Sequence, residues 1–288
     1  MAKIANVFVG KRHPVRIMGI LNTSPESFFK KSVHTDKTSI KNIVKKMEDE
    51  GADFIDIGGM STAPYLSTMV SEKVESKRIL NGIKIIQNHT NLPISVDTCR
   101  AKVARDALEC GVEIINDISG LKYDVEMQHV LSEYRPSLIL CAYDSKAVFG
   151  NSIFATKKLL NESLKIAKKS HISSEKIVLD PAIGFFRKTG KGPFFTKIKS
   201  DYVKRDLNIL KNLNSIKQNF PILISVSNKS FIGNILRKPN PSDRLFGSIA
   251  AETISVLNGA DIIRTHDVGA TKDAIMITSQ LSKRHKGL

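Results

Sequence analysis

Polar residues follow short apolar runs again and again along this chain of 288 residues. The first apolar run, residues 17–21, ends at Asn22, and the others end in the same way. The residues at these ends are Asn22, Thr62, Asp97, Asn116, Asp180, Lys229, Arg264 and His266. In an α/β barrel the carboxyl ends of the parallel strands meet at one face, where the chemistry takes place. We therefore expect these side chains to converge on one pocket.

Carboxylates and amides dominate this set of residues. A carboxylate that accepts hydrogen bonds from adjacent ring N–H groups makes paired, charge-assisted contacts. Asp97 and Asp180, together with the amides of Asn22 and Asn116, therefore suit a planar heterocycle that is rich in N–H donors. Lys229 could contact a ring carbonyl or an anionic group. The set predicts a site for a polar, planar ligand.

A second group of residues suits an anion. Arg264 and His266 are two positions apart on one predicted strand, so they face the same way and could bind a compact anion. Thr62 follows a Gly-Gly pair on a loop where the backbone can approach a ligand closely. Any one of these residues could instead be structural, because a lone strand-end carboxylate is often a cap. We expect Asp56 and Asp117 to be buried structural partners.

Strand and helix signals alternate along the whole chain, which favours a parallel sheet covered by helices. Strands are predicted at 17–21, 54–59, 93–98, 113–119, 137–143, 177–181, 221–227 and 261–266. Helices are predicted at 39–51, 101–110 and 242–257, with Ser242 as the N-cap of the last. A further helix before the strand at 93–98 has Val74, Ile79, Ile83 and Ile86 on its buried side. Eight such units predict an α/β fold of the TIM (β/α)8 barrel type, with a short N-terminal β segment, as a single domain over residues 1–288. The glycines and proline of the loop at 184–197 argue against regular structure there.

Composition narrows the class of protein. The 41% hydrophobic and 25% charged residues are typical of a soluble globular protein, and no apolar run approaches the roughly 20 residues that cross a membrane. The net charge of +16 comes from basic residues spread along helices, including Lys204 and Arg205, without a nucleic-acid motif, so we expect neither nucleic acid nor membrane as a partner. Three cysteines without metal spacing favour a reduced, cytoplasmic protein.

From residue 16 to 268 the chain resembles the dihydropteroate synthases, a family of pterin-binding barrel enzymes. Seven blocks carry the resemblance, in the family's order: residues 18–28, 51–59 with Ser61 and Thr62, 95–98, 114–118, 180–185, 228–233 and 264–268. The resemblance implies a transferase of folate biosynthesis that joins 6-hydroxymethyl-7,8-dihydropterin pyrophosphate to p-aminobenzoate and releases pyrophosphate.

The resemblance also implies a role for each matching residue. The pterin would be held by the residues Asp97, Asn116, Asp180 and Lys229. The match to Asn22 helps to hold Mg²⁺, the implied cofactor, and the matches to Arg264 and His266 bind the pyrophosphate, so that Arg264, His266 and Lys229 are the implied catalytic residues. Thr62 and Ser230 match residues near the arylamine and the leaving group. Family members commonly form homodimers through outer helices, here 242–257 and 271–281.

The chain departs from the family pattern in the loops that admit the second substrate. Met60 replaces an acid, Ala63 and Asn228 replace arginines, and the segments after Phe28 and at 141–146 are unlike the family's. Two alternatives follow. The first is a different, phosphorylated arylamine, as in methanopterin-type pathways, with Lys30, Lys31, Arg187 and Lys188 as its partners. The second is a pterin-binding protein without synthase activity. The related methyltransferases need a corrinoid partner and lack the Arg264 and His266 pair.

Overall fold

The computed structural model describes residues 2–10, 13–27, 29, 32–66 and 68–281, and within them eight parallel strands form a barrel. The strands are β3 (Arg16–Asn22), β4 (Phe54–Gly58), β5 (Ile94–Asp97), β6 (Ile114–Asp117), β7 (Ser137–Cys141), β8 (Ile177–Asp180), β11 (Leu223–Ile224) and β12 (Ile262–Thr265). They are hydrogen-bonded in the order β11-β12-β3-β4-β5-β6-β7-β8, and a bridge between Leu179 and Ile222 brings the two ends together. This arrangement confirms the predicted (β/α)8 barrel.

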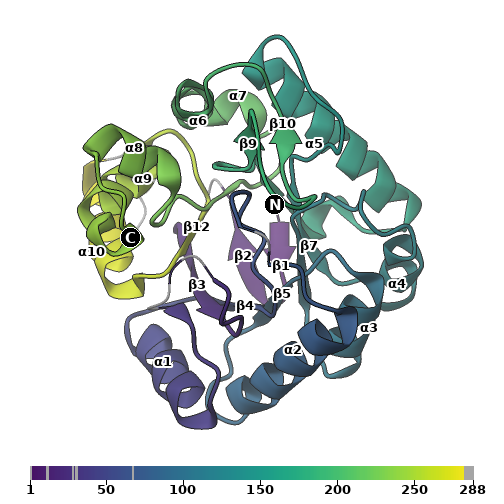
Figure 1. Cartoon of the computed structure of the whole chain (residues 1–288). Coiled ribbons are helices and arrows are strands. Elements are labelled where there is room, and N and C mark those ends of the chain that lie inside the picture. Colours follow the sequence, from purple (N-terminus) through teal and green to yellow (C-terminus); the bar gives the residue numbers. More distant parts are fainter. Residues whose placement is uncertain (1, 11–12, 28, 30–31, 67, 282–288) are drawn as a thin grey trace.

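Helices surround the barrel on all sides (Figure 1). They are α1 (Lys37–Asp49), α2 (Glu72–Gln87), α3 (Ala101–Glu109), α4 (Met127–Tyr134), α5 (Ser152–Lys169), α6 (Tyr202–Lys211), α7 (Leu213–Ile216), α8 (Ser230–Leu236), α9 (Leu245–Leu257) and α10 (Val268–Leu281). In α1, for example, Ile40, Val44 and Met47 recur at helical spacing and are buried. Such stripes pack against the outward-facing strand residues in one large core.

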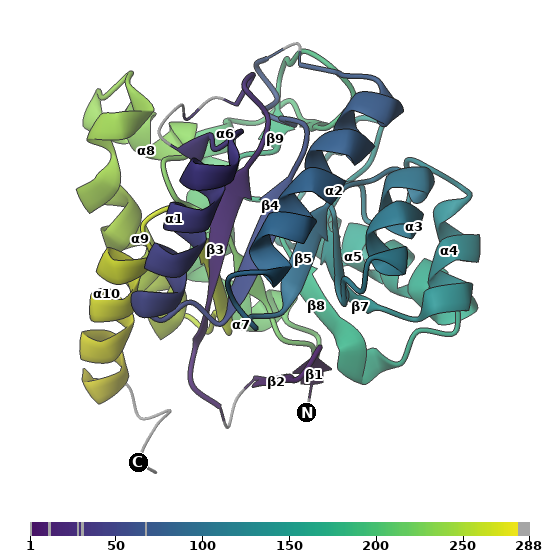
Figure 2. The ribbon, with the colours of Figure 1, turned by 90° about the horizontal axis from the view of Figure 1, so that it is seen from below.

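An N-terminal hairpin closes the bottom of the barrel (Figure 2). Strands β1 (Ala2–Ile4) and β2 (Val7–Val9) pair antiparallel. Their apolar side chains form a separate core with inward-facing strand residues, which are Met18, Phe54, Ile114, Ile139, Val178, Leu223 and Ile262. Side chains alternate along a strand, so residues two positions further on also point inward, nearer the open end. Asp56, Asn116, Asp180 and Arg264 occupy those positions.

Three expectations about local structure are wrong in detail. Val74 is exposed, because the buried stripe of α2 continues from Ile79 back to Glu75 and Ser76 rather than to residue 74. Ser242 is not a helix cap. It lies in a 3₁₀ turn, Pro241–Asp243, which is capped by Asn240, and α9 begins only at Leu245.

The loop at 184–197 also contains regular structure, since the two-residue strands β9 (Phe186–Arg187) and β10 (Thr196–Lys197) pair parallel within it. A pattern-based prediction misses such short pairs.

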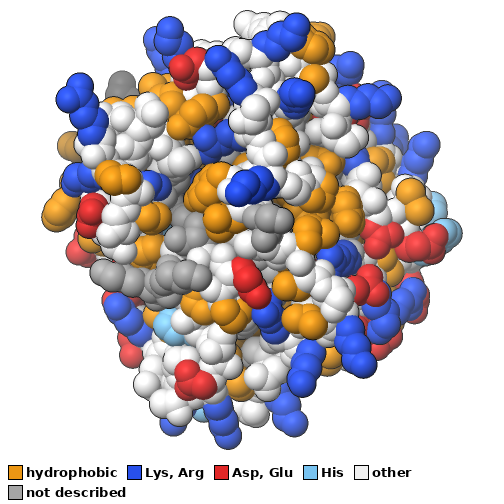
Figure 3. Space-filling model, viewed as in Figure 1, with side chains coloured by type: hydrophobic (Ala, Val, Ile, Leu, Met, Phe, Trp, Pro, Cys, Tyr) orange, Lys and Arg blue, Asp and Glu red, His pale blue; other side chains and the backbone are white. Residues whose placement is uncertain are grey.

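Basic side chains are scattered around the face that Figure 3 shows, rather than gathered in one block. Arg205 is an exception to the expected surface distribution, because it is buried in the protein interior. Within the described residues, none of the helices has the length and hydropathy of a membrane-spanning segment.

Candidate active site

One pocket at the carboxyl end of the barrel contains every residue that was predicted to bind substrate or metal. Its lining includes Asn22, Thr62, Asp97, Asn116, Asp180, Lys229, Ser230, Arg264 and His266. These residues come from strands and loops that are far apart in the chain, and Asn22 and His266 are separated by 244 positions. The barrel topology therefore brings them together, as expected from their positions at strand ends.

Arg264 forms the floor of the pocket with two carboxylates. Its Nε donates to Asp56 Oδ2 at 2.6 Å, and its Nη2 donates to Asp97 Oδ2 at 2.8 Å. The amide of Asn116 contacts the same Asp56 carboxylate at 3.3 and 3.4 Å. Burial alone would lower the pKa of Arg264, but the two carboxylates raise it above its usual value. The expectation that Asp56 is a buried structural partner holds, and this residue orients two pocket side chains.

Asp180 begins a tightly folded turn. Its Oδ1 accepts a hydrogen bond from the Ala182 N–H at 2.7 Å, and burial raises the pKa of its carboxyl. The burial of Asp97 has the same effect on its pKa, although the neighbouring Arg264 opposes the rise. Both acids therefore lie in a desolvated environment, where hydrogen bonds to ring N–H groups of a ligand are strong.

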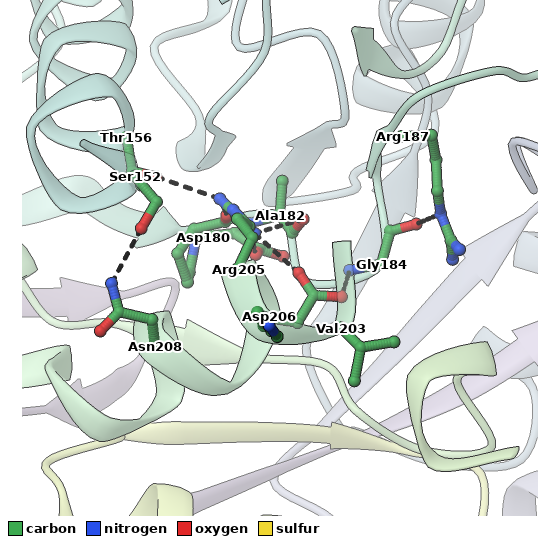
Figure 4. Close-up of polar contacts among 12 residues, drawn as sticks. Ser152, Thr156, Asp180, Ala182, Gly184, Arg187, Val203, Arg205, Asp206 and Asn208 are labelled. Carbon is green, nitrogen blue, oxygen red and sulfur yellow. Dashed lines mark hydrogen bonds and ion pairs between the residues drawn. The ribbon is translucent and has the colours of Figure 1, made fainter. Parts of the chain in front are cut away.

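A buried ion pair behind the pocket holds the turn after Asp180 (Figure 4). Arg205 donates to the carbonyls of Pro181 and Ala182 at 2.7 and 3.3 Å and to Asp206 at 3.0 Å. Asp206 in turn accepts the Gly184 N–H at 3.0 Å. Neither side chain was singled out from the sequence, because their partners are backbone groups about 20 residues away.

Lys229 projects into the pocket from the residue before α8. Its Nζ lies 4.1 Å from the centre of the Phe185 ring. Gly184 has φ +85°, and a Cβ there would lie 3.1 Å from Lys229 Cδ, so this close approach favours glycine. Burial, followed by the charge of Arg264, lowers the pKa of Lys229 to about 8. The ammonium is therefore only modestly favoured at neutral pH.

His266 acts in this pocket as a neutral group. Its Nδ1 lies 2.9 Å from Ser227 Oγ, and Phe29 packs edge-on against the ring. Burial, with the charges of Arg264 and Lys229, lowers the pKa of His266 to about 3. Any contribution of His266 to anion binding thus comes from a hydrogen bond rather than from charge. The sequence did not indicate Ser227 as its partner.

The pH dependence of kcat/KM should show whether the charge on Lys229 contributes to the reaction. A group whose pKa is about 8 is charged below that pH and loses its charge above it. If the ammonium contacts the substrate, kcat/KM for the pterin substrate should fall as the pH rises through about 8. Lys229→Arg should move this fall to higher pH, since arginine stays charged. A wild-type profile that is flat from pH 7 to 9.5 would contradict a role for the ammonium.

Asn22 offers one oxygen to a ligand. Its Nδ2 donates to Ser32 Oγ at 2.7 Å, which fixes the amide and leaves Oδ1 as the remaining acceptor. Among the described residues there is no cluster of three His, Cys, Asp or Glu side chains that could hold a metal. A single amide oxygen fits Mg²⁺ only in the usual mode, in which water and substrate phosphates supply the other ligands.

Two of the residues that depart from the family pattern, Met60 and Ala63, line the pocket. Thr62, Arg187 and Ser230 line it with them. Asn228 does not line it. That residue is buried with φ +58°, a conformation that asparagine tolerates, and its backbone contacts Ser248 and Arg244.

Of the basic residues proposed for a phosphorylated arylamine, Arg187 lines the pocket. Lys188 is exposed and is not part of the pocket lining, and Lys30 and Lys31 lie outside the described residues.

Comparisons with known proteins agree on one family. The family model described as "Pterin binding enzyme" matches residues 18–266. A dihydropteroate synthase from Clostridium beijerinckii is 36% identical over 270 residues, which cover 93% of this chain and 94% of that protein. A second one, from Synechocystis, is 33% identical over 94% of this chain and 91% of its own length.

Solved structures give the same result. A dihydropteroate synthase from Coxiella burnetii in complex with pteroic acid matches with a TM-score of 0.81 and 36% identity, over 96% of this chain and 94% of that one. A dihydropteroate synthase from Xanthomonas albilineans with 4-aminobenzoic acid matches with a TM-score of 0.82 and 27% identity, over 97% of each chain.

Proposed function

The chain belongs to the pterin-binding enzyme family, and we propose that it carries out the dihydropteroate synthase reaction of folate biosynthesis. It condenses 6-hydroxymethyl-7,8-dihydropterin pyrophosphate with p-aminobenzoate and releases pyrophosphate. The observation that carries this proposal is the convergence of the buried Asp180, the half-buried Asp97, an asparagine, a lysine and an arginine on one pocket. This reading is favoured over a carrier without activity, because relatives that match along almost the whole chain are synthases.

The floor of the pocket would bind the pterin. Asp97 and Asp180 would accept hydrogen bonds from ring N–H groups, and the Asn116 amide would pair with the remaining ring edge. Arg264, held between Asp56 and Asp97, keeps the Asp97 carboxylate in place for this contact. Lys229 would donate to the ring carbonyl. These roles need no movement of the strands that carry the residues.

The reaction replaces one bond at the exocyclic methylene carbon of the pterin. The C–O bond to pyrophosphate breaks, the arylamine nitrogen forms a C–N bond to the same carbon, and the nitrogen gives up a proton. Charge grows on the departing pyrophosphate, so donors aimed at it lower the barrier. His266 would donate such a hydrogen bond from its neutral ring, and the positive charges of Arg264 and Lys229 would add to it. The amine is already a nucleophile and needs no strong base.

Magnesium fits this arrangement as a cofactor that is shared with the substrate. Asn22 would hold it through the amide oxygen, because the amide nitrogen already donates to Ser32. Bound there, the ion would supply positive charge to the pyrophosphate.

Two assays test the proposal. Purified protein should form dihydropteroate, detected by chromatography, from the pterin pyrophosphate and p-aminobenzoate, and EDTA should remove this activity until excess Mg²⁺ restores it. Activity that resists EDTA would argue against the magnesium, whereas absence of product under every metal condition would argue against the reaction itself.

A homodimer through the outer helices is also part of this proposal. Apolar side chains are exposed on neighbouring helices α9 and α10, including Phe246, Ile277 and Leu281 at 81%, 68% and 78%. Such a patch is typical of an interface between subunits. Light scattering should give about twice the chain mass of 31.9 kDa, and a monomer would contradict the proposal.

We also place the protein in the reducing cytoplasm, since all three of its cysteines are free thiols. A protein purified under non-reducing conditions should still show three reactive thiols on unfolding.

A further inference from the structure

Arg187 places a cation at the rim of the pocket. The residue lies in β9, directly after the turn that begins at Asp180, and its side chain is half-buried. Three cations line the pocket, and of these Arg264 is the one with ion-pair partners in the described part of the chain. Arg187 and Lys229 have no such partner there. Lys229 reaches toward the deep acids, whereas Arg187 stays at the rim.

The guanidinium of Arg187 is held firmly from three sides. Its Nε donates to the Gly184 carbonyl at 2.9 Å, as Figure 4 shows, and its Nη2 donates to the hydroxyl of Ser230. Its Cζ lies 3.9 Å from the centre of the Tyr202 ring. These contacts use two of the five N–H donors of the group. The rest of the donors are available to an anion, and the group that carries them is already ordered.

The surroundings of Arg187 suit an aromatic ligand. Phe185 and Tyr65 line the pocket together with Arg187. The Lys191 N–H donates a hydrogen bond to the Pro64 carbonyl at 2.6 Å. This bond ties the loop of Ala63 to the loop of Arg187. Ala63 itself supplies no charge, so Arg187 is the cation that the described lining residues present at this rim.

We propose that Arg187 binds the carboxylate of the arylamine and so makes the enzyme prefer an acidic arylamine. This inference rests on the proposed function. The amine of p-aminobenzoate must reach the methylene carbon above the pterin, and its carboxylate is para to the amine, on the far side of the ring. The carboxylate therefore lies away from the deep acids and toward the rim. An arginine with free N–H groups binds a carboxylate through paired hydrogen bonds.

The leaving pyrophosphate is the other anion that Arg187 could meet. Two of the groups assigned to it, Asn22 and His266, are packed against Ser32 and Phe29, which belong to the segment after β3. Arg187 instead contacts Gly184 and Tyr202, which lie in the segment from β8 to α6, and Ser230 at the start of α8. The geometry thus favours the arylamine.

Steady-state kinetics with two amines tests this assignment. The wild type and Arg187→Met are assayed with p-aminobenzoate and with 4-aminobenzamide, which has the same ring but no charge. Arg187→Met should raise KM for p-aminobenzoate about 10- to 100-fold and leave KM for 4-aminobenzamide within about 3-fold. KM for the pterin pyrophosphate should stay unchanged in the same variant, which also shows that the pocket is folded.

Lys188→Met provides the matched control, since the neighbouring lysine is exposed and does not line the pocket. It should leave both KM values within about 2-fold. The assignment would be overturned if Arg187→Met raised KM equally for both amines, or if it raised KM for the pterin pyrophosphate alone. A wild type that turns over neither amine would instead contradict the proposed function, so the two failures are distinguishable.

Discussion

Asp97→Asn should weaken binding of the pterin pyrophosphate by about 1–3 kcal/mol, or roughly 5- to 150-fold in Kd. The carboxylate is the acceptor for ring N–H groups, and it also holds the Arg264 guanidinium at 2.8 Å. An amide has the same size but no charge, and it offers one acceptor oxygen in place of two. Both effects act on the floor of the pocket, where burial raises the pKa of Asp97.

Titration of the pterin's own fluorescence would measure this loss. Asp273→Asn is the control, because this aspartate is exposed on α10 and is not part of the pocket lining. A thermal melt of each variant separates weaker binding from incomplete folding. Unchanged affinity in a folded Asp97→Asn protein would remove Asp97 from the pterin site.

Asp206→Asn should destabilise the protein by about 3–5 kcal/mol. The carboxylate is fully buried and pairs with Arg205 at 3.0 Å, and Arg205 is itself only 4% exposed. Removal of one partner leaves a buried charge without compensation, which is strongly destabilising. The turn at residues 181–184 should loosen as well, because Asp206 accepts the Gly184 N–H.

Urea denaturation would give the free energy of unfolding for this variant. Asp201→Asn makes the same chemical change at the N-cap of the same helix, where the side chain is exposed and asparagine caps equally well. That control should stay within about 0.5 kcal/mol of the wild type. If the two variants lose similar amounts, the buried ion pair does not stabilise the turn as described.

The convergence of the site could be predicted because it depends on local patterns. An apolar run that ends in a polar residue marks the end of a strand, and parallel strands in a barrel share one open end. Asn22, Asp97 and Arg264 follow this rule directly. The alternation of side chains also places Asp56 and Arg264 on the inside, which is why they meet.

Contacts between distant loops could not be predicted in this way. Ser227 beside His266, and Asp206 beside Gly184, meet only after the barrel has closed. Their residue types give no signal, because a serine and a helical aspartate are common at the surface. Arg205 shows the opposite case, because a residue expected at the surface is buried. Its two Nη atoms donate to Asp206, to two carbonyls and to the Thr156 hydroxyl.

Tertiary structure also limits how well the ends of helices and strands can be predicted from the sequence. The apolar run at 221–227 predicts a full strand, yet β11 has only two residues. The pairing there is short because Ile222 bridges β8 and the later residues turn inward to form the pocket wall, in which Ser225 and Ser227 take part. A run of hydrophobic residues fixes burial better than it fixes hydrogen bonding.

The most direct test of the synthase reaction is the release of pyrophosphate from 6-hydroxymethyl-7,8-dihydropterin pyrophosphate. It is measured with Mg²⁺, both with and without p-aminobenzoate. The residues of this pocket predict slow release without the amine and release that increases with p-aminobenzoate until it saturates. Release that is independent of p-aminobenzoate, or absent although the pterin binds, would contradict the synthase reaction for this chain.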